Sequence, residues 1–259
     1  MKALFLALLL FGPALIGAPP EPGQQIWDAF VHWLQAQPPN SKPGELFAAY
    51  RAEQIRQGVS EDVANHRMAV ISDFFAARRK GTEVLWNKVF AGDHPIFLET
   101  PTPLVVTAIE NRKPGAALDV GMGQGRNSIY LAAHGWNVSG FDPSEEAVRI
   151  AQLNAAKAGA AIHAIVARDD EFDYGAERWD LIVVTYVKDL TADDARIFWR
   201  ALKPGGIVVY VNGADRDNAV LRAFLGFRIE RFEDMETNSD WNAERKTREQ
   251  RLIAQKDRN

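Results

Sequence analysis

Residues 117–142 are the segment that most restricts the fold of this chain. An apolar run ends in Asp119, and glycines follow at positions 121, 123 and 125. A helical pattern then begins, and a second apolar run ends in Asp142. This order predicts a strand, a glycine-rich loop, a helix and a second strand, an arrangement that binds nucleotides. A dinucleotide-binding loop has its third glycine three residues after the second, where this chain has Arg126, so the spacing disfavours an NAD-linked oxidoreductase.

Alternation of strands and helices continues along the chain. The expected strands are 117–120, 137–141, 162–167, 179–185 and 207–211, and the expected helices include 127–133, 144–158 and 192–202. Runs 181–184 and 207–210 are apolar on both faces, as in central parallel strands covered on both sides by helices. After a helix at about 218–225, two late strands at 227–232 and 250–255 suggest an antiparallel pair at the sheet edge. The sequence therefore predicts an α/β fold, a doubly wound, mostly parallel seven-stranded sheet with an N-terminal helical extension.

The N-terminal part carries two other patterns. Lys2 precedes an apolar run over residues 3–18, which is shorter than the roughly 20 residues of a membrane-spanning helix and is typical of a secretory signal. We therefore expect an exported protein, periplasmic or secreted, or a membrane-anchored one if the segment stays uncleaved. A proline-rich spacer and helical patterns follow. The expected division is a signal peptide or anchor at 1–18, a spacer and helical cap at 19–84, and the α/β domain at 85–259.

Charge and composition restrict the partners. The net charge is −4 and no basic stripe repeats along the chain, so we expect no nucleic-acid partner. The absence of cysteine excludes disulfides and thiolate metal sites, and we predict no metal site.

Acidic residues follow two further predicted strands. Asp142 ends the second strand, where a carboxylate can accept both hydroxyls of a ribose. Asp169 and Asp170 follow the third strand, where an acceptor would lie near an adenine amino group. In an open parallel sheet, ligands bind beyond the carboxyl ends of the strands, so these acids and the glycine loop share one crevice. Together they predict a site for an adenosine-containing ligand without a pyrophosphate.

Several of these motifs together carry a family resemblance. The segments 118–128, 141–142, 169, 179–182 and 203–206 resemble the class I S-adenosylmethionine-dependent methyltransferases. The extended loop with Gln124, Arg126, Asn127 and Ser128 is most similar to the tellurite-resistance-type branch, which acts on small molecules. The resemblance spans about residues 85–256. It implies a Rossmann-like methyltransferase domain with S-adenosylmethionine as cofactor and a small-molecule methyl acceptor.

The resemblance also implies residue roles. Asp142 would hold the ribose, Asp169 and Asp170 would lie at the adenine, and Thr185 and Tyr186 would face the sulfonium and the acceptor. The loop residues expected to surround the methionine part of the cofactor are Asp119, Gly121, Gly123 and Gly125, and Met122 and Arg126 complete the expected cofactor contacts.

Methyl transfer makes few demands on catalytic groups. It is an in-line displacement on an activated sulfonium, and orientation alone can supply up to about 7–11 kcal/mol of the barrier. A general base is therefore optional, and the candidates are Tyr186, Asp189 and His94. The alternative hypothesis is an exported or membrane-tethered module that binds S-adenosylmethionine without turnover.

Overall fold

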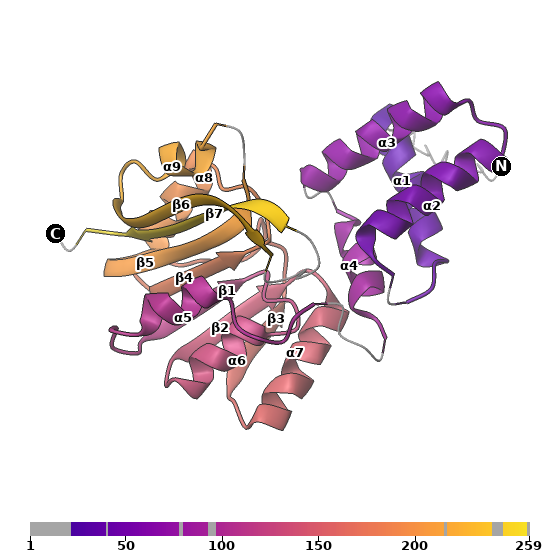
Figure 1. Cartoon of the computed structure of the whole chain (residues 1–259). Helices are drawn as coiled ribbons and strands as arrows, with labels where there is room; N and C mark the ends of the chain where they lie inside the picture. Colours follow the sequence, from indigo (N-terminus) through magenta and orange to yellow (C-terminus); the bar gives the residue numbers. More distant parts are fainter. Residues whose placement is uncertain are drawn as a thin grey trace, which may run out of the picture.

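The computed structural model describes residues 22–39, 41–77, 80–92, 97–214, 217–239 and 246–257. Figure 1 shows a bundle of N-terminal helices beside a sheet flanked by further helices. The segment predicted as a signal peptide or anchor, residues 1–18, lies outside the described residues. Within the described ranges, no helix has the length and apolarity needed to cross a membrane.

One sheet organises the larger part. In the described chain it contains seven strands in the order β3-β2-β1-β4-β5-β7-β6. Five strands run parallel, and β7 pairs antiparallel with both β5 and β6. The predicted mostly parallel seven-stranded sheet with a late antiparallel pair is confirmed. The strand bounds are β1 Ala116–Val120, β2 Asn137–Asp142, β3 Ile162–Val166, β4 Trp179–Thr185, β5 Leu202–Gly213, β6 Arg228–Asn238 and β7 Lys246–Gln255.

Helices cover both faces of this sheet because its central strands are apolar on both sides. Helices α5 (Pro103–Ile109) and α6 (Arg126–Ala133) pack with one buried cluster, and α7 (Glu145–Ala158) lies beside α6. Helices α8 (Ala192–Ala201) and α9 (Ala219–Ala223) pack with the cluster on the other face. The Ser144 side chain accepts a hydrogen bond from the backbone N–H of Ala147, so the predicted cap of α7 is confirmed.

No helix connects β3 to β4; a described loop at residues 167–178 takes its place. Aromatic side chains of this loop cover the sheet instead. Phe172 stacks on Phe141 of β2, with 4.3 Å between the ring centroids, and Tyr174 meets both rings edge-on. The polypeptide after β3 can therefore stay irregular and still bury apolar surface.

The N-terminal helices form a core of their own. They are α1 (Pro22–Gln35), α2 (Pro43–Arg56), α3 (Glu61–Ala76) and α4 (Thr82–Phe90). Trp27, Phe30 and Leu34 of α1 are buried against the other three helices, in a cluster separate from those of the sheet. Leu85 and Val89 of α4 belong to the same cluster. The predicted domain boundary between residues 84 and 85 thus falls inside a helix, and the helical unit extends to the end of α4.

Candidate cofactor site

The glycine loop at residues 121–125 joins β1 to α6 and needs glycine for steric reasons. Gly121, Gly123 and Gly125 have φ angles of +62°, +54° and +86°, in the left-handed region that favours glycine. A Cβ at Gly121 would lie 2.6 Å from Cγ2 of Val187, in the loop after β4. The loop therefore packs directly against the segment that contains Thr185 and Tyr186.

Asp142 holds the loop in place. One carboxylate oxygen accepts a hydrogen bond from the backbone N–H of Gly123 (3.0 Å), and the other accepts one from that of Ser144 (2.9 Å). The side chain is buried at the end of β2. A carboxylate has about four acceptor positions, so the same group has the capacity to hold both the loop and ribose hydroxyls.

Asp119 is a buried acid at the carboxyl end of β1. Its carboxylate accepts a hydrogen bond from the hydroxyl of Ser128 at 2.7 Å. Burial raises the pKa of Asp119 from 3.8 to about 6, against the opposing effects of the Ser128 hydrogen bond and the Arg126 charge. A cationic group bound beside Asp119 would favour its ionised form.

Met122 and Arg126, two residues predicted to contact the cofactor, lie in different surroundings. The side chain of Met122 is buried and packs with Val148 and Ala151 of α7, so it belongs to the core under the loop. The guanidinium of Arg126 donates to the carbonyl of Thr100 (3.3 Å) and lies 5.9 Å from the centroid of the Tyr186 ring. Arg126 therefore lies between the glycine loop and Tyr186, the residue expected to face the methyl acceptor.

Asp169 and Asp170, the two adjacent acids after β3, differ in burial and in their partners. The Asp169 side chain is only 9% exposed and pairs with Lys188, with 2.7 Å between Oδ2 and Nζ. Asp170 is 62% exposed and pairs with Arg168. Burial thus favours Asp169 over Asp170 for the predicted adenine contact. Lys188 was not predicted as a site residue. Its position shortly after the end of β4 is the sequence signal that could have indicated it.

The loop after β4 contains two of the candidate catalytic groups, Tyr186 and Asp189. Tyr186 has a φ of +57°, an uncommon conformation for a residue other than glycine, and its hydroxyl donates to Oε1 of Glu249 at 2.8 Å. Glu249 lies on β7, is 1% exposed, and was not predicted. Asp189 is exposed and accepts a hydrogen bond from the Asn212 side chain at 2.8 Å.

His94, the third candidate base, lies outside the described residues. Thr185, the remaining predicted contact, accepts a hydrogen bond from the Asn127 side chain of α6 at 3.1 Å. This bond links the ends of β4 and the glycine loop. The structure therefore gathers Thr185, Tyr186 and Arg126 beside the loop, with Asp189 at the surface.

Helix α4 reaches the ends of three strands. A Cβ at Gly123, after β1, would lie 3.3 Å from the ring of Phe90. The Ser144 hydroxyl, after β2, donates to the Asn87 side chain at 2.7 Å. Arg168, after β3, lies 3.7 Å from the Glu83 carboxylate. The helical unit therefore covers the edge of the sheet where the predicted cofactor contacts lie.

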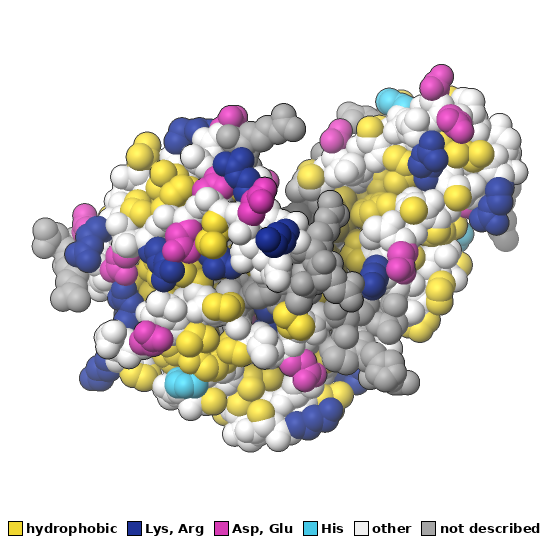
Figure 2. Space-filling view, viewed as in Figure 1, with side chains coloured by type: hydrophobic (Ala, Val, Ile, Leu, Met, Phe, Trp, Pro, Cys, Tyr) yellow, Lys and Arg dark blue, Asp and Glu magenta, His cyan; other side chains and the backbone are white. Residues whose placement is uncertain are grey.

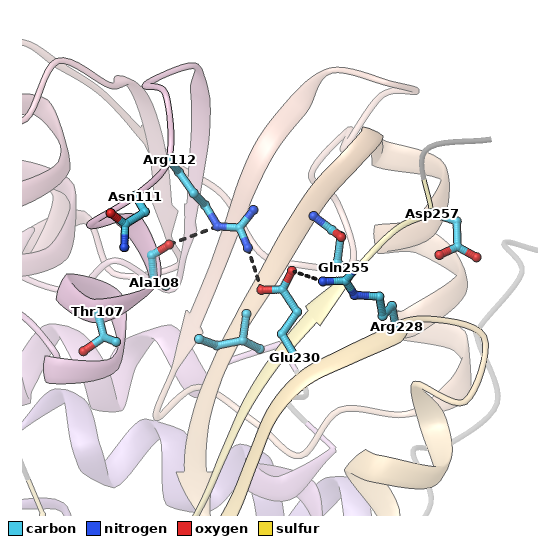
Figure 3. Close-up of a pocket in the computed structure, with 9 residues that line it drawn as sticks. Thr107, Ala108, Asn111, Arg112, Arg228, Glu230, Gln255 and Asp257 are labelled. Carbon is cyan, nitrogen blue, oxygen red and sulfur yellow. Dashed lines mark hydrogen bonds and ion pairs between the residues drawn. The ribbon is translucent and has the colours of Figure 1, made fainter.

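A cavity of about 550 Å³ lies elsewhere, between α5 and the β6–β7 pair. Its lining contains two arginines and two acids, and Arg112 pairs with Glu230 at 2.5 Å while Arg228 approaches the same carboxylate at 3.7 Å (Figure 3). Gln255, also in its lining, pairs with Ile207 near the amino end of the parallel part of β5. The cavity is therefore at the opposite end of the strands from the glycine loop.

Comparison with known proteins identifies the class. Residues 117–206 match the methyltransferase domain family. Ubiquinone biosynthesis O-methyltransferase of Methylobacterium nodulans is 35% identical over 94 residues, which are 35% of this chain and 37% of that protein. Ribosomal RNA small subunit methyltransferase C of Alcanivorax borkumensis is 32% identical over 122 residues, 43% of this chain and 37% of that protein. This chain thus spans well under half the length of these two relatives.

A solved structure shares the fold. TehB from Haemophilus influenzae superimposes with a TM-score of 0.51 at 20% identity, covering 59% of this chain and 61% of that chain. The sheet order, the glycine loop and these matches identify residues 117–206 as a class I S-adenosylmethionine-dependent methyltransferase domain. The predicted class and its cofactor are confirmed. The site fits that cofactor because the buried carboxylates of Asp119 and Asp142 flank the glycine loop, where they can accept hydrogen bonds from an amino group and from hydroxyls.

Proposed function

We propose that this protein transfers the methyl group of S-adenosylmethionine to a small-molecule acceptor. The observation that carries the proposal is the set of groups at one edge of three neighbouring strands. The glycine loop follows β1, Asp142 ends β2 and Asp169 follows β3. Both acids are largely buried, and buried carboxylates that converge on one crevice are typical of a binding site.

We infer a task for each group. The loop backbone and Asp119 would hold the methionine part, with the Asp119 carboxylate against its amino group. Asp142 would hold the ribose hydroxyls, and Asp169 would accept a hydrogen bond from the 6-amino group of adenine. The bound cofactor supplies a methyl group activated by a sulfonium. The protein's part is to orient the acceptor and to exclude water.

Tyr186 is the favoured general base for a methyl acceptor that loses a proton during the reaction. Its hydroxyl donates to the buried carboxylate of Glu249, so a proton taken up at the Tyr186 oxygen can be matched by one passed to Glu249. Asp189 has no buried carboxylate among its described hydrogen-bond partners and is exposed to solvent. The geometry therefore supports Tyr186 over Asp189.

Two observations support a small acceptor over a nucleic acid. Lysine, arginine and acidic side chains are interspersed on the face seen in Figure 2, without a continuous basic patch. The α4 contacts to Ser144 and Arg168 also narrow access to the strand ends. The relatives include both an O-methyltransferase of ubiquinone biosynthesis and an rRNA methyltransferase, so the acceptor class needs a direct experiment.

The test uses the full chain and calorimetric titration with S-adenosylhomocysteine. The wild type should bind, and Asp142→Ala should weaken binding by about tenfold or more, because charge-assisted hydrogen bonds are lost. Asp193→Ala is the matched control, since that side chain is 75% exposed on α8. No binding by the intact wild type would reject the proposal. Labelling from radioactive S-adenosylmethionine should appear in small metabolites; labelling of RNA alone would contradict the acceptor class.

The apolar run at residues 3–18 supports a further proposal, that the enzyme is exported or anchored in a membrane. Cell fractionation with sequencing of the mature N-terminus distinguishes the two. A new N-terminus near residue 18 in an extracytoplasmic fraction would support export, and a retained Met1 in membranes would support an anchor. Recovery of the uncleaved chain in the cytoplasmic fraction would contradict both.

A further inference from the structure

Lys188 lies between two largely buried carboxylates. Its Nζ is 2.7 Å from Oδ2 of Asp169 and 2.7 Å from Oδ1 of Asp194. The exposed fractions of the three side chains are 21%, 9% and 12%. A lysine that is shielded from water and shared by two acids is held more firmly than one in an exposed pair.

The Asp194 end of this arrangement is fixed by a helix. Asp194 is in the first turn of α8, and its other oxygen accepts hydrogen bonds from the backbone N–H (2.9 Å) and the hydroxyl (2.8 Å) of Thr191. These bonds are part of a capping box. The Asp169 end is different, because Asp169 belongs to the irregular loop at residues 167–178. Lys188 therefore ties a carboxylate on a loop to a carboxylate fixed at the start of a helix.

The tie also spans the cofactor site. Strands β3 and β4 are not neighbours, because β2 and β1 lie between them. The Lys188–Asp169 pair thus joins loops on either side of the two strands that end in the glycine loop and Asp142. Val187, the neighbour of Lys188, is the residue that packs against Gly121. The pair therefore lies beside the strand ends at which the adenosine would bind.

We propose that Lys188 is a positioning residue that sets the cofactor's purine specificity by fixing Asp169. This inference rests on the proposed function. A carboxylate fixed opposite position 6 accepts a hydrogen bond from a 6-amino group but meets a second acceptor when that position carries a carbonyl oxygen. A 6-oxo purine does have a donor at N1, and a carboxylate free to shift could use it. Fixing Asp169 therefore favours the 6-amino purine, and releasing it removes the preference.

The experiment compares S-adenosylhomocysteine with S-inosylhomocysteine, its 6-oxo analogue, by calorimetric titration of the full chain. The wild type should bind the adenosine compound about 10- to 100-fold more tightly. This is the range of affinity lost when a charged group loses one hydrogen bond. Lys188→Met should reduce that ratio to about threefold or less, and Lys188→Arg should retain most of it.

The matched control is Lys203→Met. Lys203 also pairs with an acid, Asp180, at 2.6 Å, but this pair is more exposed and lies at the amino ends of β4 and β5. This variant should keep the wild-type ratio. Thermal unfolding of each variant checks that it is folded, and Lys188→Gln replaces Lys188→Met if the latter is not, with the same expected loss of preference.

The ratio separates positioning from a purely structural role. A Lys188→Met protein that loses affinity for both compounds equally, and so keeps the wild-type ratio, would overturn the inference. A wild type that binds both compounds equally would overturn it too, because Asp169 would then not read position 6. Failure of the wild type to bind either compound rejects the proposed function itself, whereas binding with an unchanged ratio rejects only the role of Lys188.

Discussion

Asp119→Asn should stabilise the protein without its cofactor and weaken cofactor binding. The pKa of Asp119 in the folded protein is about 6, above the ordinary 3.8, because the group is buried. The folded state therefore binds this proton more tightly than the unfolded state does. The resulting contribution to stability is complete below about pH 4 and is lost as the pH rises to about 6 and above.

The magnitude follows from this difference in pKa. A shift of about two units at about 1.4 kcal/mol each makes the ionised carboxylate cost about 3 kcal/mol of folding free energy at neutral pH. Asparagine is nearly isosteric and uncharged, and its oxygen can still accept the Ser128 hydroxyl bond. The gain of the variant over the wild type should thus be small at about pH 4 and rise to at most about 3 kcal/mol at about pH 7.

Urea unfolding of both proteins between about pH 4 and pH 8 measures the difference, in which the other titrating groups cancel. The same preparations should show weaker binding of S-adenosylhomocysteine by the variant, because the proposed function pairs the Asp119 carboxylate with the cofactor's amino group. A difference in unfolding free energy that does not change with pH would refute the reasoning about burial. An unchanged affinity would refute only the proposed contact.

Two further predictions concern the loop and the acceptor side. Gly121→Ala should lower stability by about 1–3 kcal/mol and abolish cofactor binding, because the φ is +62° and the new Cβ would lie 2.6 Å from Val187. Thermal unfolding measures the loss of stability, and calorimetric titration measures the loss of binding. The control is Gly213→Ala, whose Cβ would meet no atom of the described part of the chain within 4 Å. Glu249→Gln should keep the wild-type affinity for S-adenosylhomocysteine but slow methyl transfer by about 100-fold or more for a proton-losing acceptor, because the Tyr186 hydroxyl loses its carboxylate partner. Single-turnover rates with the acceptor found by labelling measure the effect, and an equal loss of cofactor affinity would contradict the assignment.

The parallel part of the sheet could be predicted because its signals are local. The central strands β1, β4 and β5 contain apolar runs, and the carboxyl ends of β1 and β2 are marked by Gly121 and Asp142. The late strands were less accessible. β6 was expected to end at residue 232 but continues to Asn238, through polar residues whose stability comes from pairing with β7, as in Glu233 with Arg251 and Thr237 with Thr247. Stabilisation by cross-strand pairs leaves no apolar run in the sequence of β6 itself, although β7 is the next strand along the chain.

The same distinction applies to the site. The loop glycines and Asp142 were predicted because a strand end defines their position. Lys188 and Glu249 were missed because their roles depend on partners 19 and 63 residues away in the sequence. Asp169 and Asp170 could not be distinguished from sequence either, since adjacent residues of an irregular loop point in directions that only the folded chain determines.

The hydrogen bond from Gly123 to Asp142 has a consequence for when the glycine loop becomes ordered in this protein. The loop's curved shape is held by contacts within the protein and by three glycines at positive φ, so its loss of conformational entropy belongs to folding and not to binding. An arriving cofactor then meets a preformed loop, and no binding energy is used to order it. Helix α4 contacts the residues that follow β1, β2 and β3, so its movement would set the rate of cofactor exchange, whereas the loop would set the affinity.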